Sequence, residues 1–198
     1  MNNERIFVLC LDGATWEFID PLIREKKLPT FESIIKNGIS ATLQSTLPPT
    51  TIPAWISMFS GYSPEKLGIS DFFVFDENFN LKLVNSKLFK GKMLWDRINN
   101  KRFVVFNIPG TYPAYKINGI MITDPLGLWM EKSFYPRDIK EKIEKEFKDR
   151  IIKLKKVPIL RSSRIRHLHE LTEFETDLLI WLHYECDPDI YIYLGMKS

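Results

Sequence analysis

The chain of 198 residues predicts an α/β fold, a mostly parallel sheet with helices on both faces. Short apolar runs alternate along the chain with longer stretches of helical periodicity, and this order is typical of parallel strands joined by crossover helices. The length suffices for one domain with a sizeable core. Neither an internal repeat nor a low-complexity linker divides the chain. We therefore expect one domain over residues 1–198.

The first strand is predicted at residues 5–11, of which 8–11 are all apolar or cysteine. Asp12 follows this strand, and Gly13 allows the chain to turn away at once. Because open α/β sheets bind ligands at the carboxyl ends of their strands, the Asp12 carboxylate is well placed to hold a metal ion. The same carboxylate could instead cap the helix expected to begin near Trp16, and the residues alone leave both interpretations open.

Two helices and a strand are predicted next. Residues 16–24 place apolar side chains on one helical face, and a second helix runs from an N-cap at Thr30 to a stop at Gly38. Residues 39–45 alternate between apolar and polar side chains well enough for a second strand.

A proline-flanked stretch with two hydroxyl groups, residues 47–55, leads into the third helix. Pro53 opens an apolar run that Gly61 ends, and proline is favoured in the first turn of a helix because its missing N–H would be unpaired there. Thr51 therefore lies at or just before a helix N-terminus, where free N–H groups and the helix dipole favour an anion such as phosphate. Thr51 could also be an N-cap and nothing more, and Thr50 could replace it as the reactive hydroxyl.

A carboxylate after the first strand and a hydroxyl at this helix start together predict metal-assisted attack on an anionic ester. Residues 72–75 and 81–84 flank a polar turn and predict a hairpin over the entrance to that site. Phe72 and Tyr112 could line the substrate mouth, since aromatic side chains often wall such pockets, and packing in the core or the lid explains them equally well.

The remaining elements follow from periodicity and apolar runs. Further helices are predicted at residues 92–99, 136–147 and 167–184, and further strands at residues 102–108, 117–123 and 190–194.

The composition changes at Tyr135, and we expect residues 126–166 to form a cap on the domain or an insertion into it. Residues 148–166 hold eight basic residues against one acid. Clusters of Lys and Arg bind polyanions, but this cluster lacks the aromatic side chains that would stack on bases. We prefer a solvated face of the cap, and the net charge of +3 is too small to indicate nucleic-acid binding.

Histidines and cysteines give weaker signals. His167 and His169 could chelate a metal only on a strand or a loop, because residues two apart do not share a helical face. His183 is expected to be a packed helix residue. Cys10 and Cys186 lie in or beside apolar segments, which is typical of buried free thiols in a reducing compartment. No signal-peptide pattern and no apolar run near the ~20 residues of a membrane span is visible, so the cytoplasm is the default expectation.

Six segments of the chain carry a resemblance to known proteins. They are Val8-Leu-Cys-Leu-Asp-Gly-Ala14, Leu28-Pro-Thr-Phe31, Ser45-Thr-Leu-Pro-Pro-Thr-Thr-Ile-Pro-Ala-Trp55, Ser60-Gly-Tyr-Ser-Pro-Glu-Lys-Leu-Gly-Ile69, Gly91-Lys-Met-Leu-Trp-Asp-Arg97 and Asn107-Ile-Pro-Gly-Thr-Tyr-Pro113. In this order they resemble the alkaline phosphatase superfamily, and most closely its type I phosphodiesterase/nucleotide pyrophosphatase branch.

The resemblance implies an alkaline-phosphatase-like three-layer sandwich and a small phosphate-ester substrate. It also implies that Asp12 is a metal ligand and that Thr51 is the nucleophile and contacts a metal as well. Two divalent ions, zinc or manganese, would be the cofactors.

The chain departs from the pattern of that family in two places. The run Leu67-Gly-Ile-Ser-Asp-Phe72 lacks the His and Asn with which many nucleotide pyrophosphatases hold the phosphoryl oxygens, so nucleotide specificity is not implied. The remaining metal ligands of the family, an Asp-x-x-x-His pair and a later Asp-His with a further His, follow a strand like residues 190–194, and this sequence ends at Ser198. We therefore expect a sheet that is incomplete at its C-terminus and a catalytic centre that needs residues beyond 198.

Three functions are compatible with these observations. The first, which we expect, is a phosphoric ester hydrolase of the phosphodiesterase or pyrophosphatase type with a threonine nucleophile and a two-metal site. The second is a non-catalytic module of the same fold that binds an anion or a partner. The third is a phosphomutase or phosphotransferase of the same superfamily.

Overall fold

The structure is a computed structural model and describes residues 4–123, 130–154 and 161–195. Its centre is a five-stranded sheet in the order β1-β7-β4-β5-β6. The first four of these strands run parallel, and β6 is antiparallel to β5. The strands are β1 (Ile6–Leu11), β7 (Ile190–Gly195), β4 (Phe103–Phe106), β5 (Gly119–Ile122) and β6 (Phe134–Tyr135).

The two central strands, β4 and β7, are buried at every position. Their sequences are almost entirely apolar or aromatic, as expected of parallel strands that are covered on both faces. In the register of the sheet, Phe106 lies beside Tyr193 on one side and Ile122 on the other. The carboxyl ends of β4, β5 and β7 therefore meet at one edge of the sheet, which is where the loops after β4 and β5 begin.

One face of the sheet is covered by α3 (Thr51–Ser60), α4 (Pro64–Leu67) and α5 (Leu94–Arg97). Ile52 and Ile56 of α3 and Trp95 of α5 belong to the same buried cluster as Val105 and Ile192 of the sheet. Apolar side chains at successive turns of α3 make this packing possible, because they lie on one side of the helix.

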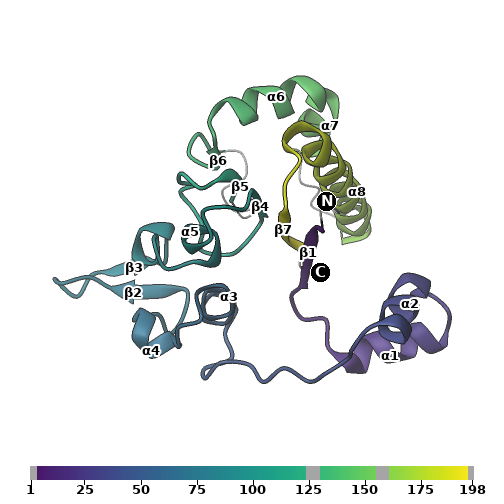
Figure 1. Cartoon of the computed structure of the whole chain (residues 1–198), viewed down its shortest axis with the longest axis horizontal. Coiled ribbons are helices and arrows are strands. Elements are labelled where there is room, and N and C mark those ends of the chain that lie inside the picture. Colours follow the sequence, from purple (N-terminus) through teal and green to yellow (C-terminus); the bar gives the residue numbers. More distant parts are fainter. Residues whose placement is uncertain (1–3, 124–129, 155–160, 196–198) are drawn as a thin grey trace.

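The opposite face is covered by α6 (Asp138–Glu146), α7 (Lys148–Leu154) and α8 (Arg161–Cys186). Ile143, Ile151 and Phe174 from these helices pack with Phe106 and Tyr193 of the sheet. Figure 1 shows the two groups of helices on opposite sides of the strands. The predicted three-layer α/β architecture with a mostly parallel sheet is confirmed.

Residues 134–154 of the predicted cap share this architecture. The short strand β6 extends the central sheet, and α6 and α7 contribute buried isoleucines to the cluster under α8. Two basic residues of the run 148–166 are paired: Arg150 with Asp177, and Lys153 with Glu170 at 2.8 Å. The cap boundaries at 126 and 166 stay a prediction, and residues 126–129 and 155–160 of that segment lie outside the described ranges.

The segment between β1 and α3 departs from the expected layout. The helices α1 (Trp16–Arg24) and α2 (Pro29–Asn37) form where they were predicted, but neither contains a buried residue. The N-cap predicted at Thr30 is wrong: Leu28 is the N-cap, and α2 begins at Pro29, which is favoured in the first turn of a helix. Figure 1 shows them to one side of the sheet, joined to α3 by an extended link. The prediction of a strand at residues 39–45 is wrong, because this stretch is exposed and forms no ladder with a neighbour. Alternation favours a strand, but only pairing stabilises one.

The predicted hairpin forms, and its expected position over the entrance to the site stays a prediction. β2 (Phe73–Phe75) and β3 (Leu81–Leu83) pair antiparallel, and Asp76 organises the turn by accepting hydrogen bonds from the N–H groups of Asn78 and Asn80, both at 2.9 Å. A 3-10 turn, η1 (Ser86–Leu88), follows it. Among the described residues, no helix is both long and apolar enough to cross a lipid bilayer.

Candidate functional site

The first candidate site residue, Asp12, lies directly after β1 in a turn that Gly13 makes possible with a φ of 74°. Its residue is half-buried. The N-cap of the following helix is Thr15. Asp12 therefore does not occupy the N-cap position, and its carboxylate at the end of the first strand stays a candidate for metal or ligand contact.

The second candidate, Thr51, is the first residue of α3, and Thr50 is the N-cap. The Thr50 hydroxyl donates to the carbonyl oxygen of Ser70 at 3.3 Å. In the described part of the chain, no hydrogen bond engages the Thr51 side chain. Of the two neighbouring threonines, Thr51 therefore has the hydroxyl that is available to a ligand.

The N-terminus of α3 also leaves backbone donors available. Pro53 has no N–H, and the N–H of Ala54 donates to the Thr50 carbonyl at 3.0 Å. The N–H groups of Thr51 and Ile52 have no partner within the described ranges. Two donors beside one hydroxyl, at the positive end of a helix, form a place where the oxygens of a phosphoryl group can bind.

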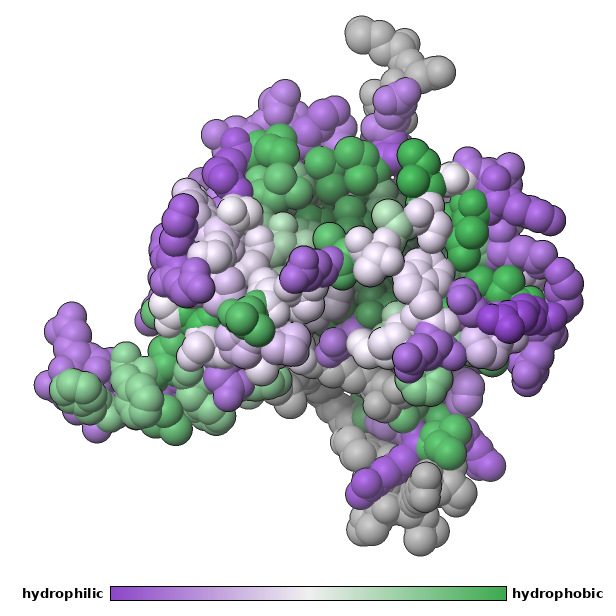
Figure 2. Space-filling view, turned by 90° about the horizontal axis from the view of Figure 1, so that it is seen from below, coloured by the Kyte–Doolittle hydropathy of each residue, from purple (hydrophilic) through white to green (hydrophobic). Residues whose placement is uncertain are grey.

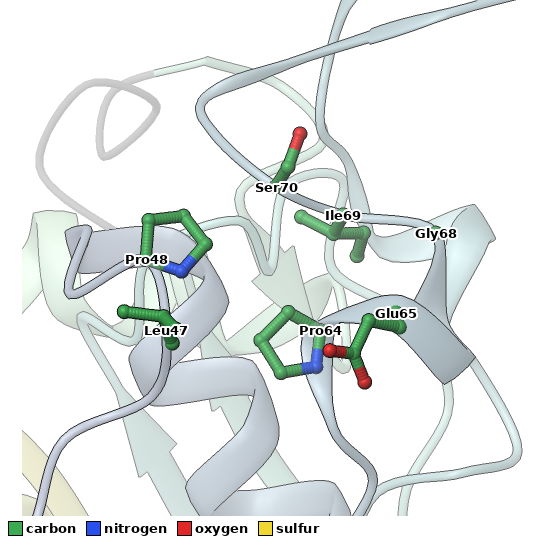
Figure 3. A pocket seen from close by; sticks show the side chains of 7 residues that line it. All are labelled: Leu47, Pro48, Pro64, Glu65, Gly68, Ile69 and Ser70. Carbon is green, nitrogen blue, oxygen red and sulfur yellow. The ribbon is translucent and has the colours of Figure 1, made fainter.

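A pocket of about 270 Å³ opens beside this helix start. Its lining comes from two segments, with Leu47 and Pro48 facing Pro64, Glu65 and Ile69 in Figure 3. The walls are mainly apolar, apart from Glu65, Ser70 and the backbone. The bond from Thr50 to Ser70 ties the pocket to the N-terminus of α3, because Ser70 is itself a lining residue. Such a pocket suits the organic part of an ester whose phosphoryl group lies at Thr51.

The structure ties the two aromatic candidates to one short segment. The carbonyl of Phe72 accepts the N–H of Val84, and the carbonyl of Tyr112 accepts the N–H of Ser86, both at 2.9 Å. Phe72 is 36% exposed, and Tyr112 is half-buried. Phe72 comes two residues after Ser70 of the pocket, so the aromatic pair borders the same region of the molecule.

The two candidate metal ligands, Asp12 and Thr51, are too few to hold a catalytic metal ion by themselves. A catalytic zinc site normally takes three protein ligands, and Asp12 and Thr51 are only two residues. Within residues 4–123, 130–154 and 161–195, no three His, Cys, Asp or Glu side chains are grouped as a metal site. His167 and His169 both lie on α8, so they point away from each other. These residues alone therefore do not fit a two-metal centre.

A comparison with protein families assigns the chain to a family. A family model described as type I phosphodiesterase/nucleotide pyrophosphatase matches residues 6–191. The chain belongs to the type I phosphodiesterase/nucleotide pyrophosphatase family. No curated protein and no solved structure matches the chain in the other two comparisons.

Neither thiol of this phosphodiesterase-family chain is suited to act as a nucleophile. Burial raises the pKa of Cys10 to about 12, and burial is also the main reason that the pKa of Cys186 rises to about 11. Both cysteines are free, and Cys10 is 3% exposed. The nucleophile is the thiolate, which is scarce at neutral pH for such groups.

The sequence interpretation missed one polar cluster of this phosphodiesterase-family chain. Asn107 Nδ2 donates to Glu175 Oε1 at 2.6 Å, and the Tyr193 hydroxyl donates to Glu175 Oε2 at 2.7 Å. Desolvation raises the pKa of Glu175 to about 7, and the hydrogen bonds from Tyr193 and Asn107 oppose part of that rise. One signal was present in the sequence, since Glu175 lies on the apolar stripe that Leu171 and Leu178 define.

Proposed function

We propose that this protein is a metal-dependent phosphoesterase of the phosphodiesterase or pyrophosphatase type, with Thr51 as its nucleophile. The observation that carries the proposal is the start of α3, where the Thr51 hydroxyl and two adjacent N–H groups have no partner in the described part of the chain. The family is one of phosphoesterases, and this is the position in the fold that best suits an anionic ester.

In the proposed reaction, the N–H groups of Thr51 and Ile52 bind two equatorial oxygens of the phosphoryl group. Donors already oriented toward the charge of the transition state lower the barrier without reorganisation. The Thr51 oxygen attacks phosphorus in line as the ester oxygen leaves, which gives a phosphothreonine. The Thr51 proton leaves with the departing alcohol, and water then cleaves the Thr51 oxygen–phosphorus bond, which releases the phosphate product and restores the hydroxyl.

The proposal includes two divalent ions, zinc or manganese, with Asp12 and Thr51 among their ligands. Ions of this kind stabilise charge on the attacking and leaving oxygens of a phosphoryl transfer. Because the described residues hold no complete ligand set, the proposal requires ligands other than these two. The cytoplasm as the compartment is part of the same proposal.

The proposed substrate is a small phosphate ester whose organic group contacts the pocket beside α3. Leu47, Pro48 and Ile69 would contact an apolar or aromatic group, and Phe72 and Tyr112 would border it. The missing His and Asn of the run 67–72 argue against a dedicated nucleotide site.

A non-catalytic module that binds an anion at the same helix start is the second candidate. The observation in its favour is the lack of a three-ligand group among the described residues. The helix N-terminus would still hold a phosphate, but nothing would activate the hydroxyl.

Turnover of bis(p-nitrophenyl) phosphate with Mn²⁺ or Zn²⁺ tests the proposal. We expect Thr51→Ala to lose nearly all activity, because in the proposed mechanism the Thr51 oxygen forms the covalent intermediate. Thr50→Ala is the matched control, since its hydroxyl is engaged by Ser70 and its loss should change the rate only a few-fold. Equal rates for wild type and Thr51→Ala would contradict the mechanism. A wild type that binds orthovanadate but turns over neither ester nor pyrophosphate would favour the second candidate.

A further inference from the structure

Glu175 is a fully buried carboxyl group in the middle of α8, on the side that faces the sheet. Its two oxygens accept hydrogen bonds from the last part of β7 and from the residue after β4, through Tyr193 and Asn107. These strands are neighbours, and the rings of Phe106 and Tyr193 stack at 5.4 Å between them. One carboxyl group therefore joins the carboxyl ends of the two central strands.

Nothing in this environment makes Glu175 a favourable choice for stability alone. A buried carboxylate without a cation is costly, and no Lys or Arg pairs with it among the described residues. An apolar residue of similar size would pack in the same layer. A carboxylate accepts from both donors, whereas a glutamine would keep the bond from Asn107 but present an N–H to Tyr193, whose hydroxyl would then have to turn and accept.

Asn107 transmits this contact to the loop after β4. It is 1% exposed and adopts a left-handed backbone conformation with φ 62°, which asparagine tolerates better than most residues with a side chain. Its N–H donates to the Ile122 carbonyl at 3.0 Å, and its side chain is held by Glu175. The backbone N–H and the side chain of Asn107 are therefore both held, and together they fix the direction in which the chain leaves β4.

The loop that Asn107 begins packs on the first turns of α3. Gly110, with φ 81°, approaches so closely that a β-carbon there would lie 3.4 Å from Ile52 Cγ2 and 3.7 Å from Ile56 Cδ1. The Thr111 hydroxyl donates to the Ile108 carbonyl at 2.6 Å and closes the loop on itself. Because Ile52 directly follows Thr51, a contiguous path of contacts joins the buried carboxyl group to the helix start.

We propose that Glu175 is a positioning residue for the reaction at Thr51. By holding Asn107 it fixes the loop 107–111, and that loop supports the first turn of α3 with its hydroxyl and free N–H groups. The inference rests on the proposed function for the catalytic consequence, but the mechanical coupling between residue 175 and α3 can be measured without it.

The test compares Glu175→Gln with Glu173→Gln, an exposed acid on the same helix that makes no contact with the sheet. Amide hydrogen exchange is followed in the peptides that cover residues 50–56 and 107–112. We expect Glu175→Gln to accelerate exchange in both peptides by about tenfold, which corresponds to one impaired buried hydrogen bond. We expect the control to change neither. The value of kcat for bis(p-nitrophenyl) phosphate should fall with little change in KM, because the nucleophile is displaced while the pocket is intact.

Asn107→Gly is the second variant and is useful if Glu175→Gln does not fold. Glycine accepts the left-handed conformation, so this change removes the side-chain link without straining the backbone. It also gives residue 107 more backbone freedom, so the peptide 50–56 is the deciding readout. It should accelerate exchange in the same two peptides. Faster exchange at 107–112 with unchanged exchange at 50–56 would overturn the proposal, as would an unchanged kcat in an active protein. If the wild type shows no turnover, the proposed function fails, and the exchange data still decide the coupling.

Discussion

At the scale of single residues, burial sets the chemistry of the ionisable groups. Glu175 and Cys10 both lie in the apolar layers of the molecule, where their charged forms lose contact with water. The pKa values of both groups are raised for this reason. The raised pKa of Glu175 predicts a pH-dependent stability, and the raised pKa of Cys10 predicts an unreactive thiol.

The carboxyl group of Glu175 should make the free energy of unfolding depend on pH. Its pKa is about 7 in the folded protein against 4.5 when exposed, so the folded state keeps a proton that the unfolded state has lost. Stability is then highest below about pH 4.5 and falls until about pH 7, by about 3 kcal/mol at 1.4 kcal/mol per pKa unit. Glutamine does not ionise, so the free energy of unfolding of Glu175→Gln should rise relative to that of wild type between about pH 4.5 and pH 7. Urea unfolding at several pH values measures the free energy of unfolding of both proteins. A difference between wild type and Glu175→Gln that does not change with pH would contradict the prediction.

The thiol of Cys10 should be unreactive in the native protein. It is 3% exposed and its pKa is raised to about 12, so both access and thiolate content are low. We expect Ellman's reagent to label it only after denaturation, with a rate at least about a hundredfold lower in the folded state. Cys186→Ser leaves Cys10 as the one thiol in the chain and makes the assay unambiguous. Rapid labelling of Cys10 under native conditions would show that β1 opens readily.

At the scale of elements, helices of similar length differ in how many of their residues are buried. The helix α1 has nine residues and α3 has ten. Five residues of α3 are buried, whereas α1 and α2 have none. Isolated helices of this length are marginal in water, so α1 and α2 depend on each other for whatever stability they have.

We therefore expect amide hydrogens of α1 and α2 to exchange much faster than those of α3. Opening of an unpacked helix should require about 1 kcal/mol or less, while α3 and α8 should approach the global free energy of unfolding. Exchange followed by mass spectrometry gives both values in one experiment, with α3 as the internal control. Comparable protection in α1 and α3 would mean that the apolar face of α1, with Phe18 67% exposed here, is covered in solution.

At the scale of the whole molecule, apolar side chains remain on the surface in several places. The hairpin projects from the body of the molecule, and Figure 2 shows hydrophobic side chains along it. Phe75 and Leu81 are register partners and are 68% and 58% exposed. Two-stranded sheets also leave both edges unpaired, and exposed patches of this kind favour association.

We expect the protein to self-associate in a concentration-dependent way through this hairpin. Replacing Phe75 and Leu81 together by serine should shift a dilution series in sedimentation velocity toward the monomer, weakening association by about tenfold or more. Ile152→Ser removes an exposed apolar residue of α7 and serves as the control. An unchanged distribution in the double variant would exclude the hairpin as the contact.

Sequence alone sufficed for features that depend on neighbouring residues. Apolar runs gave the central strands, and periodicity gave α1, α2 and α8. Proline and threonine spacing gave the N-terminus of α3 at Thr51, because turns, caps and helix starts are decided within a few residues. The hairpin was predictable for the same reason, from two apolar stretches around the turn at Asp76.

Only the tertiary structure decided which segments meet. It inserts residues 190–195 between β1 and β4, leaves residues 39–45 without a strand partner, and places Glu175 against Asn107 and Tyr193. Each of these depends on contacts between positions many residues apart. Local propensity does not encode such contacts, because hydrogen-bond partners and burial are properties of the assembled layers.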